Sequence, residues 1–113
     1  MFFNSTGCKN IGPNELNDMM KANKDFLLLD VRTPQEHGAQ AIEGSHLIPL
    51  QEFGLRIDEL PKNKEIVVYC RTGNRSAHAC SYLSRMGYNV KNLEGGIMLW
   101  NMSGNVSMTT ASR

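Results

Sequence analysis

Cys70 stands between a short apolar run and a polar loop, a position that suits a reactive thiol. Residues 66–69 read Ile-Val-Val-Tyr, which is typical of a buried strand, and the loop after Cys70 carries one glycine and two arginines. From Ser76 the spacing changes to that of a helix. The N–H groups of a tight loop and of a helix N-terminus favour negative charge, so they lower the pKa of a thiol between them. The sequence therefore predicts that Cys70 is a nucleophile.

The side chains that follow this cysteine suit an anionic sulfur in different ways. Arg71 and Arg75 are placed to steer an anionic donor and stabilise the thiolate, whereas Gly73 lets the backbone turn closely about the sulfur. Thr72 and Ser76 offer hydroxyl hydrogen bonds, and Ser76 also suits the N-cap of the following helix. We expect these side chains to line the site.

Composition narrows the class of protein. The chain has 113 residues, 41% apolar and 20% charged, which fits one globular domain. A net charge of +1 without a basic block argues against nucleic acid as a partner. Its apolar runs are too short for a membrane span, and its start lacks the apolar region of a signal peptide. We expect a cytoplasmic, monomeric protein that does not bind membranes.

The three cysteines predict free thiols and no metal. An odd number in a chain of this size favours a reducing compartment. Cys70 and Cys80 are ten residues apart and His78 has no matching partner, so no ligand set has metal spacing. We expect no cofactor. Cys80 suits a core position on a helix, with a resolving thiol as the alternative, and Cys8 is expected to be idle. His78 is expected at the surface.

Strands alternate with helical segments along the chain, which predicts an α/β fold with a largely parallel sheet covered by helices. Strands are expected at 26–31, 45–50, 66–69 and 88–93, and helices after Pro13, after the Thr33–Glu36 capping box, over 51–60, from Ser76 and over 97–100. A flexible lead-in (1–10) and tail (102–113) flank the domain (11–101). Ligands bind at the carboxyl ends of parallel strands, where Cys70 stands.

Two charged residues lie at the end of the predicted strand 26–31: Asp30 is within it, and Arg32 follows it directly. Asp30 is expected to be a buried, hydrogen-bonded anchor near the site, and Arg32 to hold the next turn, through Glu36. We place both as supporting residues.

An ordered set of short motifs resembles the single-domain rhodaneses, which are persulfide-forming sulfurtransferases. The set comprises Asp-Val-Arg-Thr-Pro-Gln-Glu (30–36), Ile-Pro-Leu (48–50), Val-Val-Tyr-Cys-Arg-Thr-Gly-Asn-Arg-Ser (67–76) and Leu-Glu-Gly-Gly (93–96) with Trp100. The resemblance implies a central parallel five-stranded sheet. It also implies that Cys70 carries the sulfane sulfur, wrapped by Arg71, Thr72, Gly73, Asn74, Arg75 and Ser76.

The same resemblance implies the reaction. A donor such as thiosulfate loses its outer sulfur to Cys70, and a thiol or cyanide acceptor takes it, with a thioredoxin-like or sulfur-carrier protein as a possible acceptor. One stretch departs from the family: residues 40–44 read Gln-Ala-Ile-Glu-Gly where Gly-His-Ile-Pro-Gly is frequent. Ala41 replaces the customary His, so we expect a repacked loop in an active enzyme, with His46 the nearest residue to replace its hydrogen bonds.

Of three alternative functions, two conflict with the sequence and one stays open. A cysteine phosphatase needs Cys-x5-Arg to clamp an oxyanion, but four residues separate Cys70 from Arg75 and Ser76 takes the sixth place. A purely regulatory module usually lacks the cysteine, which this chain keeps. A persulfide carrier that serves one dedicated partner stays open, because surface contacts around the loop choose the acceptor.

Overall fold

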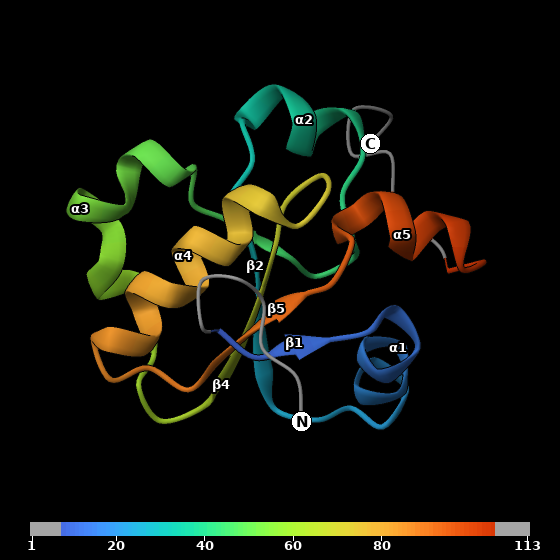
Figure 1. Cartoon of the computed structure of the whole chain (residues 1–113), viewed down its shortest axis with the longest axis horizontal. Coiled ribbons are helices and arrows are strands. Elements are labelled where there is room, and N and C mark those ends of the chain that lie inside the picture. Colours follow the sequence, from blue (N-terminus) through green and yellow to red (C-terminus); the bar gives the residue numbers. More distant parts are fainter. Residues whose placement is uncertain (1–7, 106–113) are drawn as a thin grey trace.

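Five parallel strands form one sheet, in the order β1-β5-β4-β2-β3, in the computed structural model, which describes residues 8–105 (Figure 1). The strands are β1 (Asn10–Ile11), β2 (Phe26–Asp30), β3 (His46–Leu47), β4 (Glu65–Tyr69) and β5 (Val90–Leu93). Since β4 is central, Cys70 emerges from the middle of the sheet's carboxyl edge. The predicted α/β fold with a five-stranded parallel sheet is confirmed.

The two longest strands bury side chains on both faces of the sheet, which explains their continuous apolar sequences. Leu29 and Val68 belong to the core on one face, whereas Leu28 and Val67 belong to the core on the other. β2 and β4 pair along their whole length. They therefore end at the same level, and the segments that follow them meet at one edge.

Helices cover both faces. They are α1 (Pro13–Lys21), α2 (Pro34–Ala39), α3 (Phe53–Arg56), α4 (Asn74–Arg85) and α5 (Gly96–Met102), with 3-10 turns at Leu50–Glu52 and Ile57–Glu59. α1 and α5 cover one face of the sheet, and α3 and α4 cover the other (Figure 1). α2 lies at the carboxyl edge, near the loop that follows β4.

Local signals explain where two helices begin. α1 begins at Pro13, which has no N–H to leave unpaired, and it buries Leu16 and Met19. α2 begins with a capping box: the Thr33 hydroxyl accepts the N–H of Glu36 at 3.1 Å, and the Glu36 carboxylate accepts the N–H of Thr33 at 3.0 Å. Both starts agree with the sequence predictions.

Three segments are shorter or more broken than predicted. The strand expected over 45–50 is reduced to His46–Leu47, and the last strand begins at Val90 instead of residue 88. The single helix expected over 51–60 is three short pieces. Its apolar residues do not share one face, because Leu55 is 90% exposed, so no continuous stripe holds a long helix against the sheet.

The described chain begins inside the fold, contrary to the expected lead-in. Asn10 starts β1, and Cys8 is buried and forms a disulfide with Cys80, with the two Cα atoms 5.9 Å apart. The predictions of free thiols at these two positions, and of an idle Cys8, are therefore wrong. The cysteines no longer support the expected reducing, cytoplasmic location. Residues 1–7 of the expected lead-in and 106–113 of the expected tail lie outside the described residues.

Within the stretch from Cys8 to Asn105, no helix combines the length and the apolar character needed to cross a membrane.

Candidate active site

The thiol of Cys70 is the centre of the candidate site. Cys70 directly follows β4, is 1% exposed and is the free cysteine of the chain. Its Sγ accepts a hydrogen bond from the N–H of Gly73 at 3.1 Å, and the hydroxyl of Ser76 lies 3.3 Å away. Across residues 8–105, no three His, Cys, Asp or Glu side chains gather as a metal site would require.

Opposing effects set the pKa of this thiol. Burial is the largest single effect and raises the pKa, because it disfavours the charged form. The hydroxyl of Ser76 and the N–H groups of Ser76, Gly73 and Thr72 lower it, and together they prevail. The pKa of Cys70 therefore lies below its ordinary value, which agrees with the acidic thiol expected from the loop and helix.

The start of α4 differs from the prediction and brings more donors to the sulfur. The helix begins at Asn74, with Gly73 as its N-cap, so Ser76 lies in the first turn and is not the cap. Gly73 has a φ of +105°, a left-handed conformation that favours glycine. This turn directs the Gly73 N–H to Sγ, while the Gly73 carbonyl accepts the helical N–H of Ala77.

The first turn of α5 holds the backbone of the loop. The N–H of Ile97 donates to the carbonyl of Cys70 at 2.9 Å, and the N–H of Met98 donates to the carbonyl of Arg71 at 3.1 Å. Gly96 has a φ of +60°, and a Cβ there would collide with these two carbonyl groups. The glycine at this position therefore lets the first turn of α5 approach the Cys70 loop closely.

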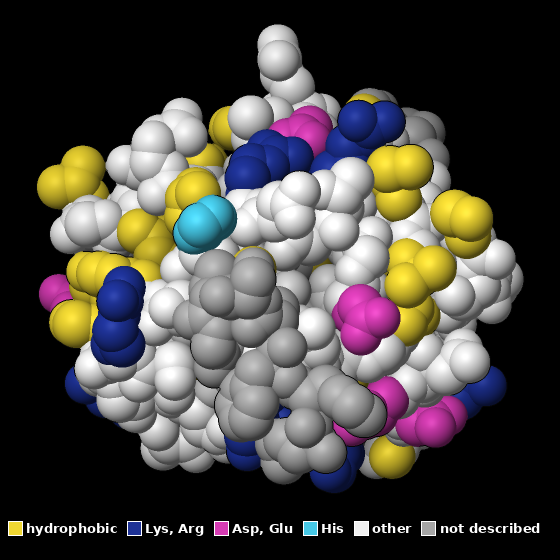
Figure 2. Space-filling model, in the orientation of Figure 1, with side chains coloured by type: hydrophobic (Ala, Val, Ile, Leu, Met, Phe, Trp, Pro, Cys, Tyr) yellow, Lys and Arg dark blue, Asp and Glu magenta, His cyan; other side chains and the backbone are white. Residues whose placement is uncertain are grey.

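Arg75 faces α2 instead of the sulfur. Its Nη1 and Nη2 each donate to one carboxylate oxygen of Glu36 at 2.9 Å. These bonds lower the pKa of Glu36 to about 2, although its partial burial opposes the shift. Figure 2 shows basic and acidic side chains meeting where Figure 1 places α2 and the loop. The sequence predicts that Arg75 steers an anionic donor and stabilises the thiolate; the structure adds that the Glu36 carboxylate balances its charge.

The other loop side chains lie at the surface. Arg71, Thr72 and Asn74 are exposed, and Thr72 contributes its N–H to the sulfur. Within residues 8–105, Arg71 takes part in no ion pair. Arg71 is therefore the unbalanced cation next to Cys70 in sequence. His78 is exposed on α4, as expected.

Asp30 is a buried, hydrogen-bonded anchor, as predicted. It accepts bonds from the backbone N–H and Nε of Arg32, both at 2.9 Å, and from Nη2 at 2.8 Å. Nδ1 of His37 also lies 2.8 Å from it. Arg32 bonds to the carbonyl of Gln40 at 2.7 Å, so its predicted pairing with Glu36 is wrong. Burial lowers the pKa of Arg32, but the bonds to Asp30 outweigh it and raise the pKa.

The stretch that lacks the customary His is held by Tyr69. The Tyr69 hydroxyl accepts the N–H of Ile42 at 3.1 Å and lies 2.9 Å from the hydroxyl of Ser45. Burial, with the nearby negative charge of Asp30, raises the pKa of Tyr69 to about 12. His46 does not replace the missing His: it contacts Glu59 at 3.0 Å on an exposed face.

Sequence reasoning missed two residues around the site. His37 reaches Asp30 from a short helix, and no spacing rule pointed to it. Asn92 on β5 is 3% exposed and accepts the Ser76 hydroxyl at 2.5 Å. A signal for Asn92 was present: it is two residues after Val90, so it shares that residue's inward-facing side of the strand.

Known proteins share this architecture. The family model described as a rhodanese-like domain matches residues 12–103. A sulfurtransferase of Allochromatium vinosum is 40% identical over 80% of this chain and 85% of its own length. The thiosulfate sulfurtransferase PspE of Escherichia coli is 38% identical over 61% of this chain and 68% of its own length.

Solved structures agree with the sequence comparisons. The crystal structure of a rhodanese-related protein from Thermoplasma volcanium superimposes with a TM-score of 0.83 at 35% identity, covering 89% of this chain and 98% of that protein. The family-model match spans strands β2 to β5, the Cys70 loop and the glycine turn that holds it. This chain belongs to the rhodanese-like domain family of sulfurtransferases.

Proposed function

We propose that this protein is a thiosulfate sulfurtransferase, which moves a sulfane sulfur from an anionic donor to a thiol or cyanide acceptor through a persulfide on Cys70. The environment of Cys70 carries the proposal: a free, buried thiol with a lowered pKa, facing backbone N–H groups. Similarity to the thiosulfate sulfurtransferase of Escherichia coli supports the choice of donor.

In the first half-reaction, the Cys70 thiolate attacks the outer sulfur of thiosulfate. A new S–S bond forms to Sγ, the S–S bond of the donor breaks, and its electron pair leaves with sulfite. The product is a Cys70 persulfide whose negative charge lies on the outer sulfur. The N–H groups of Gly73, Ser76 and Thr72 already surround Sγ, so we expect them to stabilise the anion on the adjoining outer sulfur with little reorganisation.

In the second half-reaction, a thiolate or cyanide attacks the outer sulfur. The persulfide S–S bond breaks and its electron pair returns to Sγ, which restores the Cys70 thiolate. Because the donor product leaves before the acceptor reacts, the kinetics are of the ping-pong type. For a protein acceptor, we propose a thioredoxin-like or sulfur-carrier protein that supplies the attacking group.

Donor selection rests on charge at the surface of the loop. Thiosulfate is a dianion, and Arg71 is the exposed cation beside Cys70 without a carboxylate partner in the described chain. Long-range attraction by such a group raises the rate of encounter and weakens with salt. Arg75 contributes less, because Glu36 neutralises it.

The test is direct. The protein is incubated with thiosulfate, its intact mass is recorded without reductant, and released sulfite is measured. We expect the mass of one added sulfur atom and one sulfite per chain. Addition of cyanide then removes the extra mass and produces thiocyanate.

The matched control is Cys70→Ser, which should gain no sulfur and release no sulfite. Added sulfur on the Cys70→Ser protein, or none on the wild type, would overturn the mechanism. A persulfide that forms but resists cyanide and small thiols would instead identify a carrier that serves a dedicated partner. Hydrolysis of an aryl phosphate without sulfur transfer would point to phosphatase chemistry.

A further inference from the structure

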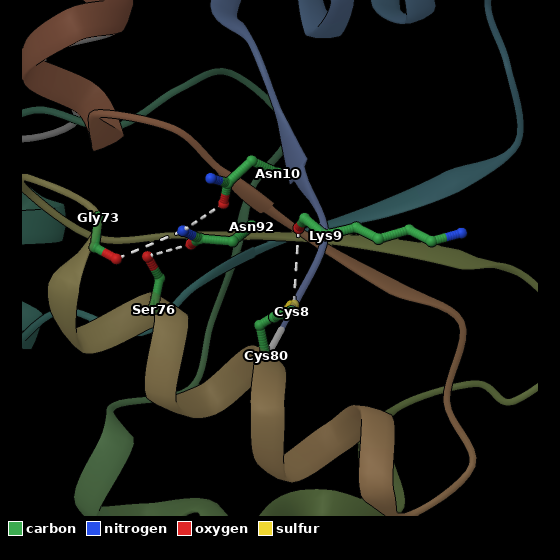
Figure 3. The surroundings of a disulfide bond; sticks show 7 residues. All are labelled: Cys8, Lys9, Asn10, Gly73, Ser76, Cys80 and Asn92. Atoms are coloured by element: carbon green, nitrogen blue, oxygen red, sulfur yellow. Dashed lines mark hydrogen bonds between the residues drawn. A yellow bond between two sulfur atoms is a disulfide. The ribbon is translucent and has the colours of Figure 1, made fainter. Parts of the chain in front are cut away.

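The Ser76 hydroxyl has one hydrogen and two acceptors within reach. Its Oγ lies 3.3 Å from Sγ of Cys70 and 2.5 Å from Oδ1 of Asn92, the second contact being drawn in Figure 3. A hydroxyl donates one hydrogen bond at a time. The acceptor that holds this hydrogen therefore decides whether the sulfur is stabilised by backbone N–H groups alone or by the hydroxyl as well.

The amide of Asn92 is oriented by a group that has no hydrogen to offer. Its Nδ2 lies 3.4 Å from the carbonyl oxygen of Gly73 and 3.3 Å from Oδ1 of Asn10 (Figure 3). Turning the amide over would press Oδ1 against the Gly73 carbonyl oxygen, two acceptors without a hydrogen between them. Oδ1 of Asn92 therefore faces Ser76, and Asn92 itself is buried, with 3% of its surface exposed.

Three elements build this arrangement. Asn10 on β1 is the register partner of Asn92 on β5, and both turn their side chains toward α4 (Figure 3). On α4, Ser76 and Cys80 are one turn apart, and Cys80 is joined to Cys8, two residues before Asn10. The disulfide therefore joins the segment just before β1 to the same helix that the amide network contacts.

We propose that Asn92 is a positioning residue that shares the Ser76 hydroxyl with Cys70, holding its hydrogen bond while Sγ is neutral and releasing it when Sγ is anionic. The functional meaning rests on the proposed sulfur transfer. Sγ is anionic before attack and neutral in the persulfide, where the charge has moved to the outer sulfur. The hydroxyl turns to Sγ in the first state and returns to Asn92 in the second.

This exchange keeps the buried hydroxyl bonded at every stage and limits how strongly the thiolate is stabilised. A buried donor left without an acceptor is costly. A thiolate with a very low pKa is also a weaker nucleophile. Asn92 competes for the hydrogen, so it keeps the pKa of Cys70 above the value that the N–H groups and an unshared Ser76 hydroxyl would produce.

Charged groups near Cys70 come from the loop, from α4, from α2 and from the end of β2, and a neutral change at Asn92 leaves them untouched. They are Arg71 in the loop, Arg75 in α4 with Glu36 of α2, and Asp30 and Arg32 at the end of β2, with His37 beside them. Replacing Asn92 by Leu or Ala leaves every one of these charges in place. A change in the pKa of Cys70 would therefore report the hydroxyl.

The experiment measures the rate of alkylation of Cys70 by iodoacetamide against pH, followed by the mass of the peptide that contains Cys70. No sulfur donor is involved, so the result is independent of whether the proposed function holds. In Asn92→Leu and Asn92→Ala, the Ser76 hydroxyl no longer has Asn92 as an acceptor and donates to Sγ. We expect both to lower the apparent pKa of Cys70 by up to about one unit, the size of the neutral Ser76–Asn92 hydrogen bond that no longer has to be broken when Sγ becomes anionic.

The Ser76→Ala background separates positioning from packing. There, Asn92→Leu should leave the pKa of Cys70 unchanged, because no hydroxyl remains to be shared. Asn89→Leu, the same change at an exposed asparagine, should leave it unchanged in the wild-type background. A pKa that stays the same or rises in the single Asn92 variants, or a shift that persists in the Ser76→Ala background, would overturn the proposal.

Discussion

Of the two arginines near the sulfur, Arg75 is neutralised by Glu36, whereas Arg71 is not neutralised by a carboxylate of the described chain. Arg75 is held by a carboxylate through two bonds of 2.9 Å, whereas Arg71 is exposed and lacks such a partner in the described chain. A negative donor therefore meets a field in which one of two arginines is neutralised. We therefore expect Glu36, which also closes the capping box of α2, to weaken the attraction of anions to Cys70 from a separate helix.

Replacing Glu36 by Gln removes this balancing charge and frees the Arg75 guanidinium. We expect the KM for thiosulfate to fall by about two- to five-fold with little change in kcat, the scale of one partly exposed ion pair. Steady-state kinetics at low and high salt provide the measurement, and salt should reduce the gain. Glu15→Gln, on the surface of α1, makes the same change in net charge elsewhere. An equal fall in KM in that control would contradict a local role for Glu36.

At the scale of elements, the loop residues that follow Cys70 in sequence could be predicted because their signals are local. An apolar strand, a glycine and a helix follow one another in sequence, and the backbone between them brings its N–H groups to Sγ. The start of α4 was misjudged because Ser76 looks like an N-cap, whereas Gly73 forms the cap through its positive φ. The segment 51–60 was misjudged because the exposure of Leu55 depends on packing that the sequence does not display.

The glycine turn before α5 gives a prediction at this scale. In Gly96→Ala, the new Cβ would press on the carbonyls of Cys70 and Arg71 and would disfavour the φ of +60°. We expect the free energy of unfolding to fall by about 2 kcal/mol or more. We also expect kcat/KM for sulfur transfer to fall by more than the loss of folded protein explains. Urea unfolding and kcat/KM for thiosulfate measure the two effects.

Gly54→Ala is the matched control for that variant. Gly54 lies in α3 with open space around its Cα, so alanine should raise the free energy of unfolding by up to about 1 kcal/mol and leave turnover unchanged. If Gly96→Ala behaved like Gly54→Ala, the turn would not be holding the loop.

At the scale of the whole molecule, pairings between distant segments are what the sequence did not reveal. Glu36 meets Arg75 from 39 positions away, and Cys8 meets Cys80 from 72 positions away. Each pairing depends on which faces β1, α2 and α4 present once the sheet has formed. The sheet itself could be predicted, because alternating strands and helices leave few arrangements.

The disulfide between Cys8 and Cys80 closes most of the described chain into one loop. Cross-linking residues 72 positions apart restricts the unfolded chain, so reduction should lower the free energy of unfolding by about 2–4 kcal/mol. Urea unfolding with and without dithiothreitol measures the difference. Cys70→Ser should keep this sensitivity to reductant, and Cys8→Ser should lose it. Equal unfolding free energies for the wild type in both conditions would mean that β1 is held to α4 by packing and hydrogen bonds alone.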